Sequence, residues 1–383
     1  MAVGSPAPGL YITGLGSQYP PYLLAPHDLE NFAARYYDLT KPGIKKLLQL
    51  NRSTSIETRS AIRQYDTGFA TDSKAPSIAD IDNFFREAGV DLAVQACKKA
   101  LGEANMAPEQ ITHTIGVTCT NQGNPGYDLV VARELDLPLS VDRTLLHGVG
   151  CAGGLSLLRA AAQLAGGASV RRKPARILAF ACELCTPNVR YYLSLAEQYG
   201  NSEKANIAGA LFSDAAAAFV LCNEYAVAQD QQSIPQLELL EWGCDVIPDT
   251  VDRMSFYADY TTLAIGPMFN KLLLSYEERL QPQGQPSKEV PRSLEIGDFD
   301  WALHPGGKAI IDGASEGLQL SEEQLQTTRE IYRTRGNSSS ASVLIVLDQI
   351  RSQSNRQHIV ATSFGPGLTI EMALLRKCQV NHS

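Results

Sequence analysis

Cys151 is the residue whose surroundings most suggest chemistry. It lies in HGVGCAGG, residues 147–154, where the glycines and Ala152 leave room for a substrate carbonyl to approach the sulfur. The pattern predicts that a helix opens here, and the unpaired N–H groups and dipole of a helix N-terminus stabilise a thiolate. A lone cysteine in a glycine-rich turn is more often a small packing residue, so a chemical role depends on partners elsewhere in the chain.

Two such partners are His304 and Asn337. His304 ends an apolar strand in WALHPGG, residues 301–307, and the proline and glycines after it predict a turn that exposes the imidazole. As a base or an ion-pair partner, this imidazole would hold Cys151 as a thiolate. Asn337 follows a glycine and is predicted to open a helix, and its amide could join His304 in donating hydrogen bonds to an oxyanion.

The remaining histidines and the short motifs offer less. His147 lies four residues before Cys151 in the same predicted strand, and we predict it to be a buried structural histidine. The sequence has no glycine-rich nucleotide-binding motif and no HExxH zinc motif. A Cys, a His and an Asn without a predicted metal or cofactor indicate acyl transfer or thioester chemistry.

The other cysteines are predicted to be structural. Cys97 and Cys222 lie in apolar helical or strand patterns, where a free thiol packs as a small hydrophobic group. Cys182 and Cys185 form a single CxxC, which without a second pair does not predict a metal or redox site. The spacing of the eight cysteines shows no disulfide framework, and the N-terminus has no secretory pattern. We therefore expect reduced thiols and a cytoplasmic location.

The composition restricts the class of protein. The chain has 383 residues, of which 44% are hydrophobic and 19% charged, and no run of 18 apolar residues, so we expect a soluble globular protein without a membrane span. A net charge of −8 argues against a nucleic-acid partner. A local basic cluster could still bind phosphates, or could equally be a solvated helix face; its members are Lys41, Lys45, Lys46, Arg52 and Arg59.

Strand-like and helical segments alternate along the chain, which is typical of a layered α/β protein. Helical periodicity is clear in residues 81–104 and 153–167, and residues 281–293 are predicted to form a surface linker. Apolar runs of strand length begin near residues 111, 143, 175, 215, 298 and 358.

Three of these elements recur in order after roughly half the chain. The strand near 111 corresponds to the one near 298, the helix after Cys151 to the one after Asn337, and the strand near 175 to the one near 358. We therefore predict two homologous halves, residues 1–225 with the nucleophilic cysteine and 226–383 with the histidine and asparagine. On this interpretation Cys151 and Asn337 occupy equivalent positions.

With these residues in these segments, the chain resembles the type III polyketide synthases related to chalcone synthase, and in particular the fungal acylalkylpyrone synthases among them. VGCAGG is similar to the family's nucleophile segment, WALHPGGKAIID to its histidine segment, and RGNSSSASVLIVLD to its asparagine segment. GALFSDAAAAF at 209–219 and SFGPGLTIE at 363–371 are similar to two further family segments. The resemblance covers nearly the whole chain and implies the thiolase-like fold, five αβαβα layers built from two halves.

The resemblance also implies roles for individual residues. Cys151 would take an acyl group from an acyl-CoA, while His304 and Asn337 would stabilise the enolate formed when malonyl-CoA loses CO2. Phe212 would separate the CoA tunnel from the reaction cavity, and Arg52 and Arg59 would contact CoA phosphates. The substrate pocket would include Cys119, Thr120, Cys185, Gly365 and Pro366. A second gatekeeping residue is expected within 252–269, without assignment to a position.

The implied enzyme is an acyltransferase of secondary metabolism that acts as a homodimer, with CoA thioesters as substrates and no cofactor. Ala152, Cys119 and Cys185 differ from the plant pattern and suggest a cavity suited to fatty acyl starters. The expected reaction is decarboxylative Claisen condensation with malonyl-CoA and closure to an α-pyrone, with joining of β-ketoacyl units as a further hypothesis. An alkylresorcinol synthase, a ketoacyl synthase III-like enzyme and a non-catalytic acyl-CoA-binding homologue remain alternatives.

Overall fold

The computed structural model describes most of the chain. The described residues are 9–72, 74–198, 208–230, 232–250, 258–280, 294–353 and 355–378. The linker predicted at 281–293 and the first part of the segment 252–269 lie outside them. No helix in these ranges has the length and apolar character needed to cross a membrane.

A nine-stranded mixed sheet runs through both halves of the protein, in the order β5-β4-β6-β7-β1-β8-β11-β10-β9. The strands of the first half are β1 (Leu10–Gln18), β4 (His113–Val117), β5 (Asp142–Leu146), β6 (Arg176–Glu183) and β7 (Ala215–Asn223). Those of the second half are β8 (Leu237–Val246), β9 (Phe299–Leu303), β10 (His358–Gly365) and β11 (Thr369–Lys377). All six apolar runs predicted as strands are confirmed, whereas β1, β8 and β11 were not among the predictions.

The two halves repeat the same strand pairing. In the first half β1 pairs antiparallel with β7, β7 antiparallel with β6, and β6 parallel with β4. In the second half β8 pairs antiparallel with β11, β11 antiparallel with β10, and β10 parallel with β9. The predicted repeat is therefore confirmed. The proposed division between residues 225 and 226 stays a prediction; it falls inside the short helix α9 (Glu224–Gln229).

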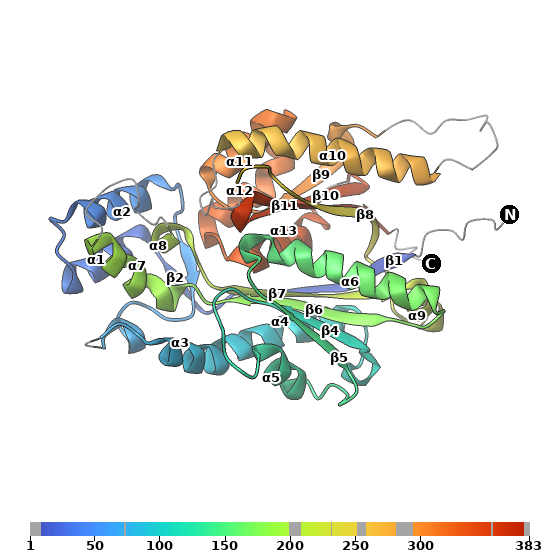
Figure 1. The fold of residues 1–383 in the computed structure, drawn as a ribbon, viewed down its shortest axis with the longest axis horizontal. Helices are drawn as coiled ribbons and strands as arrows, with labels where there is room; N and C mark the ends of the chain where they lie inside the picture. Colours follow the sequence, from blue (N-terminus) through green and yellow to red (C-terminus); the bar gives the residue numbers. More distant parts are fainter. Residues whose placement is uncertain are drawn as a thin grey trace.

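Five layers result from the packing of helices on this sheet (Figure 1). The two middle helices are α6 (Gly153–Val170) and α13 (Ser342–Ile350), which lie between the two parts of the sheet. The outer face of the first half carries α3 (Ile78–Phe84), α4 (Val90–Glu103) and α5 (Tyr127–Glu134). That of the second half carries α10 (Ala258–Leu280) and α11 (Lys308–Leu318), with α12 (Glu322–Arg335) packed on β9.

Small residues allow the two middle helices to approach closely. A Cβ atom at Gly154 would lie 2.4 Å from the carbonyl oxygen of Ser340, and one at Gly153 would lie 2.8 Å from Ser340 Cβ. Any larger residue at these two positions would push the start of α6 away from the start of α13. Since Cys151 precedes α6 and Asn337 precedes α13, this packing brings the two candidate residues together.

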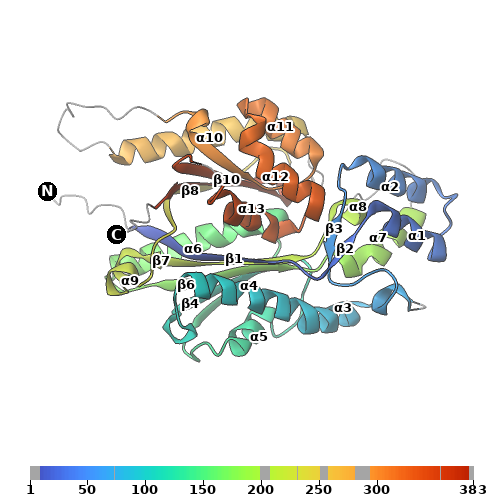
Figure 2. The same ribbon diagram turned by 180° about the vertical axis from the view of Figure 1, so that it is seen from behind.

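A side lobe stands at one end of the layered body, as seen from both sides in Figures 1 and 2. It consists of α1 (Pro26–Tyr36), α2 (Pro42–Ser53), α7 (Val189–Gln198), α8 (Ala208–Leu211) and the hairpin of β2 (Tyr22–Leu24) with β3 (Arg59–Ala61). Its own apolar core includes Phe32, Leu47, Phe69 and Leu193. The lobe reaches the catalytic region through β3 and α8, because Asp214 N donates to Ser60 O.

The two predicted helices are confirmed with changes of detail. The segment 81–104 is continuous from α3 to α4, but one π-helical turn at Phe85–Gly89 joins them. The predicted equivalence of Cys151 and Asn337 is wrong. Cys151 is the middle residue of the 3₁₀ turn Gly150–Ala152 before α6, and the middle residue of the corresponding turn Ser339–Ala341 before α13 is Ser340.

Candidate active site

Cys151 is held by a tight turn at the start of α6. Gly150 has φ of +52°, in the left-handed region that favours glycine, and a Cβ there would lie 2.7 Å from Pro366 Cδ. Gly365 is equally restricted, because a Cβ at that residue would lie 2.7 Å from Val149 O. The two predicted pocket residues Gly365 and Pro366 therefore pack directly on the turn that carries the nucleophile, and Cys151 is 5% exposed.

Asn337 is fixed by its backbone and by its side chain. Its N–H donates to Leu211 O (3.1 Å) and its carbonyl accepts from Ser213 N (2.9 Å), so Phe212 forms a bridge with it. The side-chain Oδ1 accepts from Ser339 N (2.8 Å), and Nδ2 donates to Gly306 O (3.2 Å). These bonds fix which end of the amide is the donor, and they place the half-buried Phe212 beside Asn337.

His304 is completely buried at the end of β9, and its backbone N–H donates to Thr362 O (2.8 Å). Neither ring nitrogen has a hydrogen-bond partner within the described part of the protein. Gly306 connects the histidine to Asn337, because its carbonyl accepts from Asn337 and a Cβ on it would lie 3.1 Å from His304 Cδ2. A buried imidazole without partners is costly, so this ring is available to a group that enters the site.

Ser339 completes the connection to the nucleophile. Its Oγ lies 3.5 Å from Cys151 Sγ, and Asn337 also forms a hydrogen bond with that sulfur. Cys151 and Asn337 therefore lie together, and Gly306 brings in His304. The sequence predicted the three catalytic candidates; it did not predict Ser339, although the run SSSA after Asn337 was a visible sign of a polar turn.

Burial controls the protonation of both titratable groups. It raises the pKa of Cys151 from the ordinary 9.0 to about 11, although hydrogen bonds from Ser339 and Asn337 oppose the rise. Burial also lowers the pKa of His304 from 6.5 to about 3. Both shifts disfavour the expected thiolate and imidazolium pair in the protein without substrate. Desolvation outweighs the helix N-terminus, and both groups are neutral at pH 7.

A wholly buried carboxylate, Glu183, lies behind the nucleophile. Its oxygens accept from Cys119 N (3.1 Å), Cys119 Sγ (3.3 Å), Thr120 Oγ1 (2.8 Å) and Ser340 Oγ (2.5 Å). Burial raises its pKa although all these donors lower it. Two predicted pocket residues, Cys119 and Thr120, thus share one acceptor. Glu183 was not predicted, since ACELC reads only as an apolar strand end.

Cys185 lies near these groups. Its backbone N–H donates to Asp214 Oδ1 (2.6 Å), and burial, followed by the nearby Glu183, raises the pKa of its buried thiol, to which Cys119 and Cys151 are also close enough to contribute. Three thiols predicted for the site therefore gather in one region. Within the described residues no group of three His, Cys, Asp or Glu side chains is arranged to hold a metal ion.

The basic candidates differ in position. Arg52 is exposed on α2 and forms a two-pronged ion pair with Glu30 (2.6 and 2.7 Å). Arg59 is only 4% exposed and donates to Gly209 O, while its Nη2 has no partner in the described structure. The burial of Arg59 does not support a contact with CoA phosphates at the surface, and the role of Arg52 stays a prediction. His147, predicted to be buried, is exposed after the end of β5.

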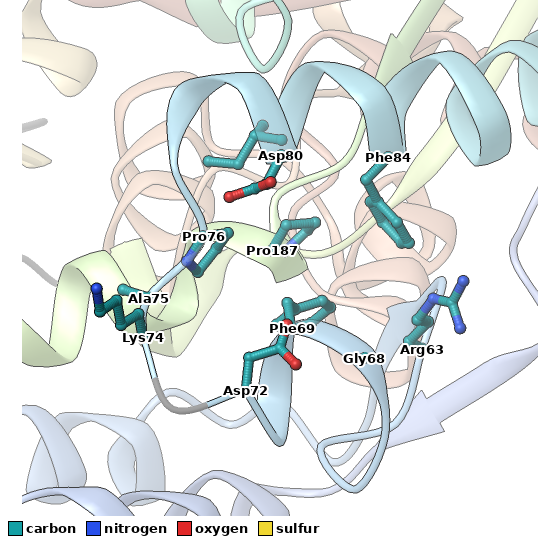
Figure 3. A pocket seen from close by; sticks show the side chains of 11 residues that line it. Arg63, Gly68, Phe69, Asp72, Lys74, Ala75, Pro76, Asp80, Phe84 and Pro187 are labelled. Atoms are coloured by element: carbon teal, nitrogen blue, oxygen red, sulfur yellow. The ribbon is translucent and has the colours of Figure 1, made fainter.

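A surface hollow of about 470 Å³ lies between the side lobe and α3 (Figure 3). Its walls include Arg63, Phe69, Lys74, Phe84 and Pro187. None of Cys151, His304 and Asn337 lines it, and the Arg63 guanidinium lies over the Phe84 ring at 5.2 Å. The hollow is therefore separate from the three candidate catalytic residues.

Comparison with known proteins identifies the family. Residues 32–224 match the profile described as chalcone and stilbene synthases, N-terminal domain, and residues 286–379 match that of the C-terminal domain. The chain is 64% identical to the type III polyketide synthase pspB of Penicillium soppii over 392 aligned positions, covering 98% of each. It belongs to the type III polyketide synthases.

Other members of this family have similar sequences and folds. The acylalkylpyrone synthase csyB of Aspergillus oryzae is 31% identical, with 97% of this chain and 95% of that protein aligned. The crystal structure of the fungal type III polyketide synthase ORAS superposes with a TM-score of 0.88 at 36% identity, covering 97% of this chain and all of that one. A structure of CsyB complexed with CoA-SH gives the same score at 30% identity, covering 96% and 100%. The fold is thus the thiolase-like fold of a condensing enzyme.

Proposed function

We propose that this type III polyketide synthase condenses a fatty acyl-CoA starter with malonyl-CoA and closes the chain to an α-pyrone. The observation that carries the proposal is the meeting of Cys151, Asn337 and a buried His304 whose two ring nitrogens have no partner in the described structure. The relative named acylalkylpyrone synthase supports the pyrone product. We further propose a cytoplasmic homodimer that needs no cofactor beyond its CoA thioesters.

The loading step begins with neutral partners. Because the Cys151 pKa is about 11 and the His304 pKa about 3, the thiol gives up its proton to the imidazole only as the sulfur attacks the acyl-CoA carbonyl. The C–S bond to Cys151 forms, the bond to CoA breaks, and the proton leaves with the CoA thiol. The acyl-enzyme that results carries no charge, which suits a site of low polarity.

The extension step uses the same two donors for a different oxygen. The malonyl thioester carbonyl would accept hydrogen bonds from His304 and from Asn337 Nδ2. One N–H of this amide is held by Gly306 O, and the other would leave the Cys151 sulfur for the carbonyl. Loss of CO2 leaves the electron pair on the α-carbon, and both donors stabilise the enolate oxygen. Each such donor lowers the activation barrier, and removing one typically raises it by about 2.7–4 kcal/mol. The enolate then attacks the Cys151 thioester, and the thiolate is released.

The starter preference follows from the side chains around the sulfur. Ala152 follows the nucleophile directly, and Cys119 and Cys185 supply small, weakly polar groups. A wall of this kind accepts a flexible alkyl chain better than a polar wall would, since it offers few donors that the chain would leave unpaired. Ring closure through an enol oxygen would then give the pyrone.

The test is a product analysis with a nucleophile control. Purified protein is incubated with malonyl-CoA and acyl-CoAs from acetyl to palmitoyl, and the products are identified by mass spectrometry and fragmentation. We expect alkylpyrones from the longer starters, and none from Cys151→Ala. Resorcinols in place of pyrones would reject the mode of cyclisation, and products from the Cys151→Ala variant would reject the assigned nucleophile.

A further inference from the structure

Two thiols in the site share one hydroxyl group. Ser339 Oγ lies 3.5 Å from Cys151 Sγ and also 3.5 Å from Cys119 Sγ. The two sulfurs therefore lie within twice that distance of each other. Rotation of a cysteine side chain about its Cα–Cβ bond is enough to bring the second sulfur toward an acyl group held by the first.

Cys119 has a candidate base beside its thiol, although burial and then the nearby Glu183 raise the pKa of that thiol well above its ordinary value. Its thiol donates to Glu183 Oε2 at 3.3 Å, and unlike Cys151 and Cys185 it keeps exposed surface. The carboxylate is in turn oriented by Thr118 Oγ1 (3.2 Å), Thr120 and Ser340. A nucleophile, a base within hydrogen-bond reach and groups that orient the base form the general pattern of covalent catalysis. Nothing in the decarboxylation and condensation steps above uses this pair.

We propose that Cys119 is a second acyl acceptor, which takes the acyl or ketoacyl chain from Cys151. The Cys119 proton passes to Glu183 as the sulfur attacks the Cys151 thioester. The carbon–sulfur bond to Cys119 forms, the one to Cys151 breaks, and the proton that Glu183 took up returns to the released Cys151 sulfur. One thioester replaces another, so the step needs no further reactant. The inference rests on the proposed loading of Cys151.

The transfer would allow one site to hold two chains. With the first chain on Cys119, Cys151 is again a free thiol and can be loaded with a second acyl group. The two thioesters would then lie in one site, where the enolate of one chain could be positioned to attack the other. This arrangement gives a physical basis for joining two ketoacyl units in a protein that has one conventional nucleophile.

Acyl mapping on the whole protein tests the transfer. The wild-type protein is mixed with excess decanoyl-CoA, quenched in acid at increasing times, weighed intact and digested with pepsin for peptide mapping. We expect Cys151 to be labelled first and Cys119 later, with up to two acyl groups per chain, both released by hydroxylamine. Labelling that stops at one acyl group on Cys151 over all times would overturn the inference while leaving the proposed function intact. An unlabelled Cys151 would instead reject the loading step itself.

Three variants identify the route. In Cys151→Ala we expect no acyl group on Cys119; a labelled Cys119 in this variant would show direct acylation and reject the transfer. Cys119→Ser should stop at one acyl group. Glu183→Gln should slow the labelling of Cys119 by at least about 100-fold, the contribution of a general base, whereas equal rates would exclude that role. The partly exposed Cys244 and Cys378 report non-enzymatic acylation in every sample.

Discussion

The protonation of Cys151 without substrate gives the sharpest test of the site. The sequence suggests a thiolate held by a helix N-terminus and by His304, whereas the structure makes both groups neutral because both are buried. The two possibilities predict different pH dependence for alkylation of the thiol, because the thiolate is the reactive form. The perturbation is therefore the pH itself, applied to the protein without CoA.

The expected effect follows from the raised pKa. Moving the pKa from 9.0 to about 11 favours the thiol by about 2.7 kcal/mol, so at pH 7 only about one molecule in ten thousand carries the thiolate. The thiolate fraction is about 100-fold below that of an ordinary cysteine. Because the Cys151 thiolate is more basic than an ordinary one, it is also about 8-fold more nucleophilic, which partly offsets the smaller thiolate fraction. Alkylation at pH 7 should thus be about tenfold slower than for an ordinary exposed cysteine, and should rise about tenfold per pH unit up to about pH 10.

The assay follows iodoacetamide labelling of the Cys151 peptide by mass spectrometry between about pH 6 and pH 10. The shape of the profile is the result of interest, because limited access of the reagent lowers every point equally. His304→Gln serves as the control, and its profile should match that of the wild type. A wild-type rate that is already constant from about pH 6 to pH 8, and that falls when His304 is replaced, would show an ion pair and refute the argument from burial.

Three further predictions concern stability and the glycine contacts. The folded protein keeps His304 neutral down to about pH 3 while the unfolded chain takes up a proton near pH 6.5, so this contribution to stability is complete above pH 6.5 and is lost as the pH falls. The loss of stability amounts to about 2 kcal/mol at pH 5. Urea unfolding of His304→Gln should therefore show a smaller fall in the free energy of unfolding between pH 6.5 and 5 than the wild type shows. Gly365→Ala places a Cβ 2.7 Å from Val149 O and should lower the free energy of unfolding by about 1–3 kcal/mol, and with it the melting temperature. The rate of acyl loading on Cys151 should also fall, whereas normal loading would show that the turn can move. Glu371→Gln removes the buried carboxylate that pairs with Arg159 of α6, whose side chain is 32% exposed, and should cost about 1.5–3 kcal/mol. Arg52→Gln, at an exposed pair, should cost less than about 1 kcal/mol in the same denaturant titration.

The sequence was sufficient for the elements that have a strong local signal. Buried strands such as β6 and β7 are nearly continuous apolar runs of strand length. The helix at 153–167 is rich in alanine and leucine, so these local patterns alone identified all three elements. The strand β8 was missed because LELLEWGCDV alternates irregularly and is only partly buried. The strand β1 was missed because five of its nine residues are small or polar; two of them, Gly14 and Gly16, lie close against α4.

The sequence singles out the three candidate residues but not the electrostatics around them, and their catalytic roles stay predictions. Cys151, His304 and Asn337 each stand beside a glycine or proline turn, which a sequence shows directly. The surroundings of Glu183 and Ser339 depend on residues more than 150 positions away in the chain, such as the bond from Ser340 to Glu183, whose separation is 157. Burial of the whole group is a property of the assembled layers, and it is burial that reverses the predicted charge state of Cys151.

The neutral state of the site has a consequence for its selectivity. A thiolate would react with any electrophile that reached it, whereas a neutral thiol becomes nucleophilic only when a bound carbonyl develops charge beside His304 and Asn337. In the proposed mechanism, the same buried imidazole, unpartnered in the described structure, receives the proton in loading and donates to the enolate oxygen in extension. One desolvated group can serve both steps because it starts without a charge and without a partner, so that each incoming thioester supplies the interaction that the protein itself lacks.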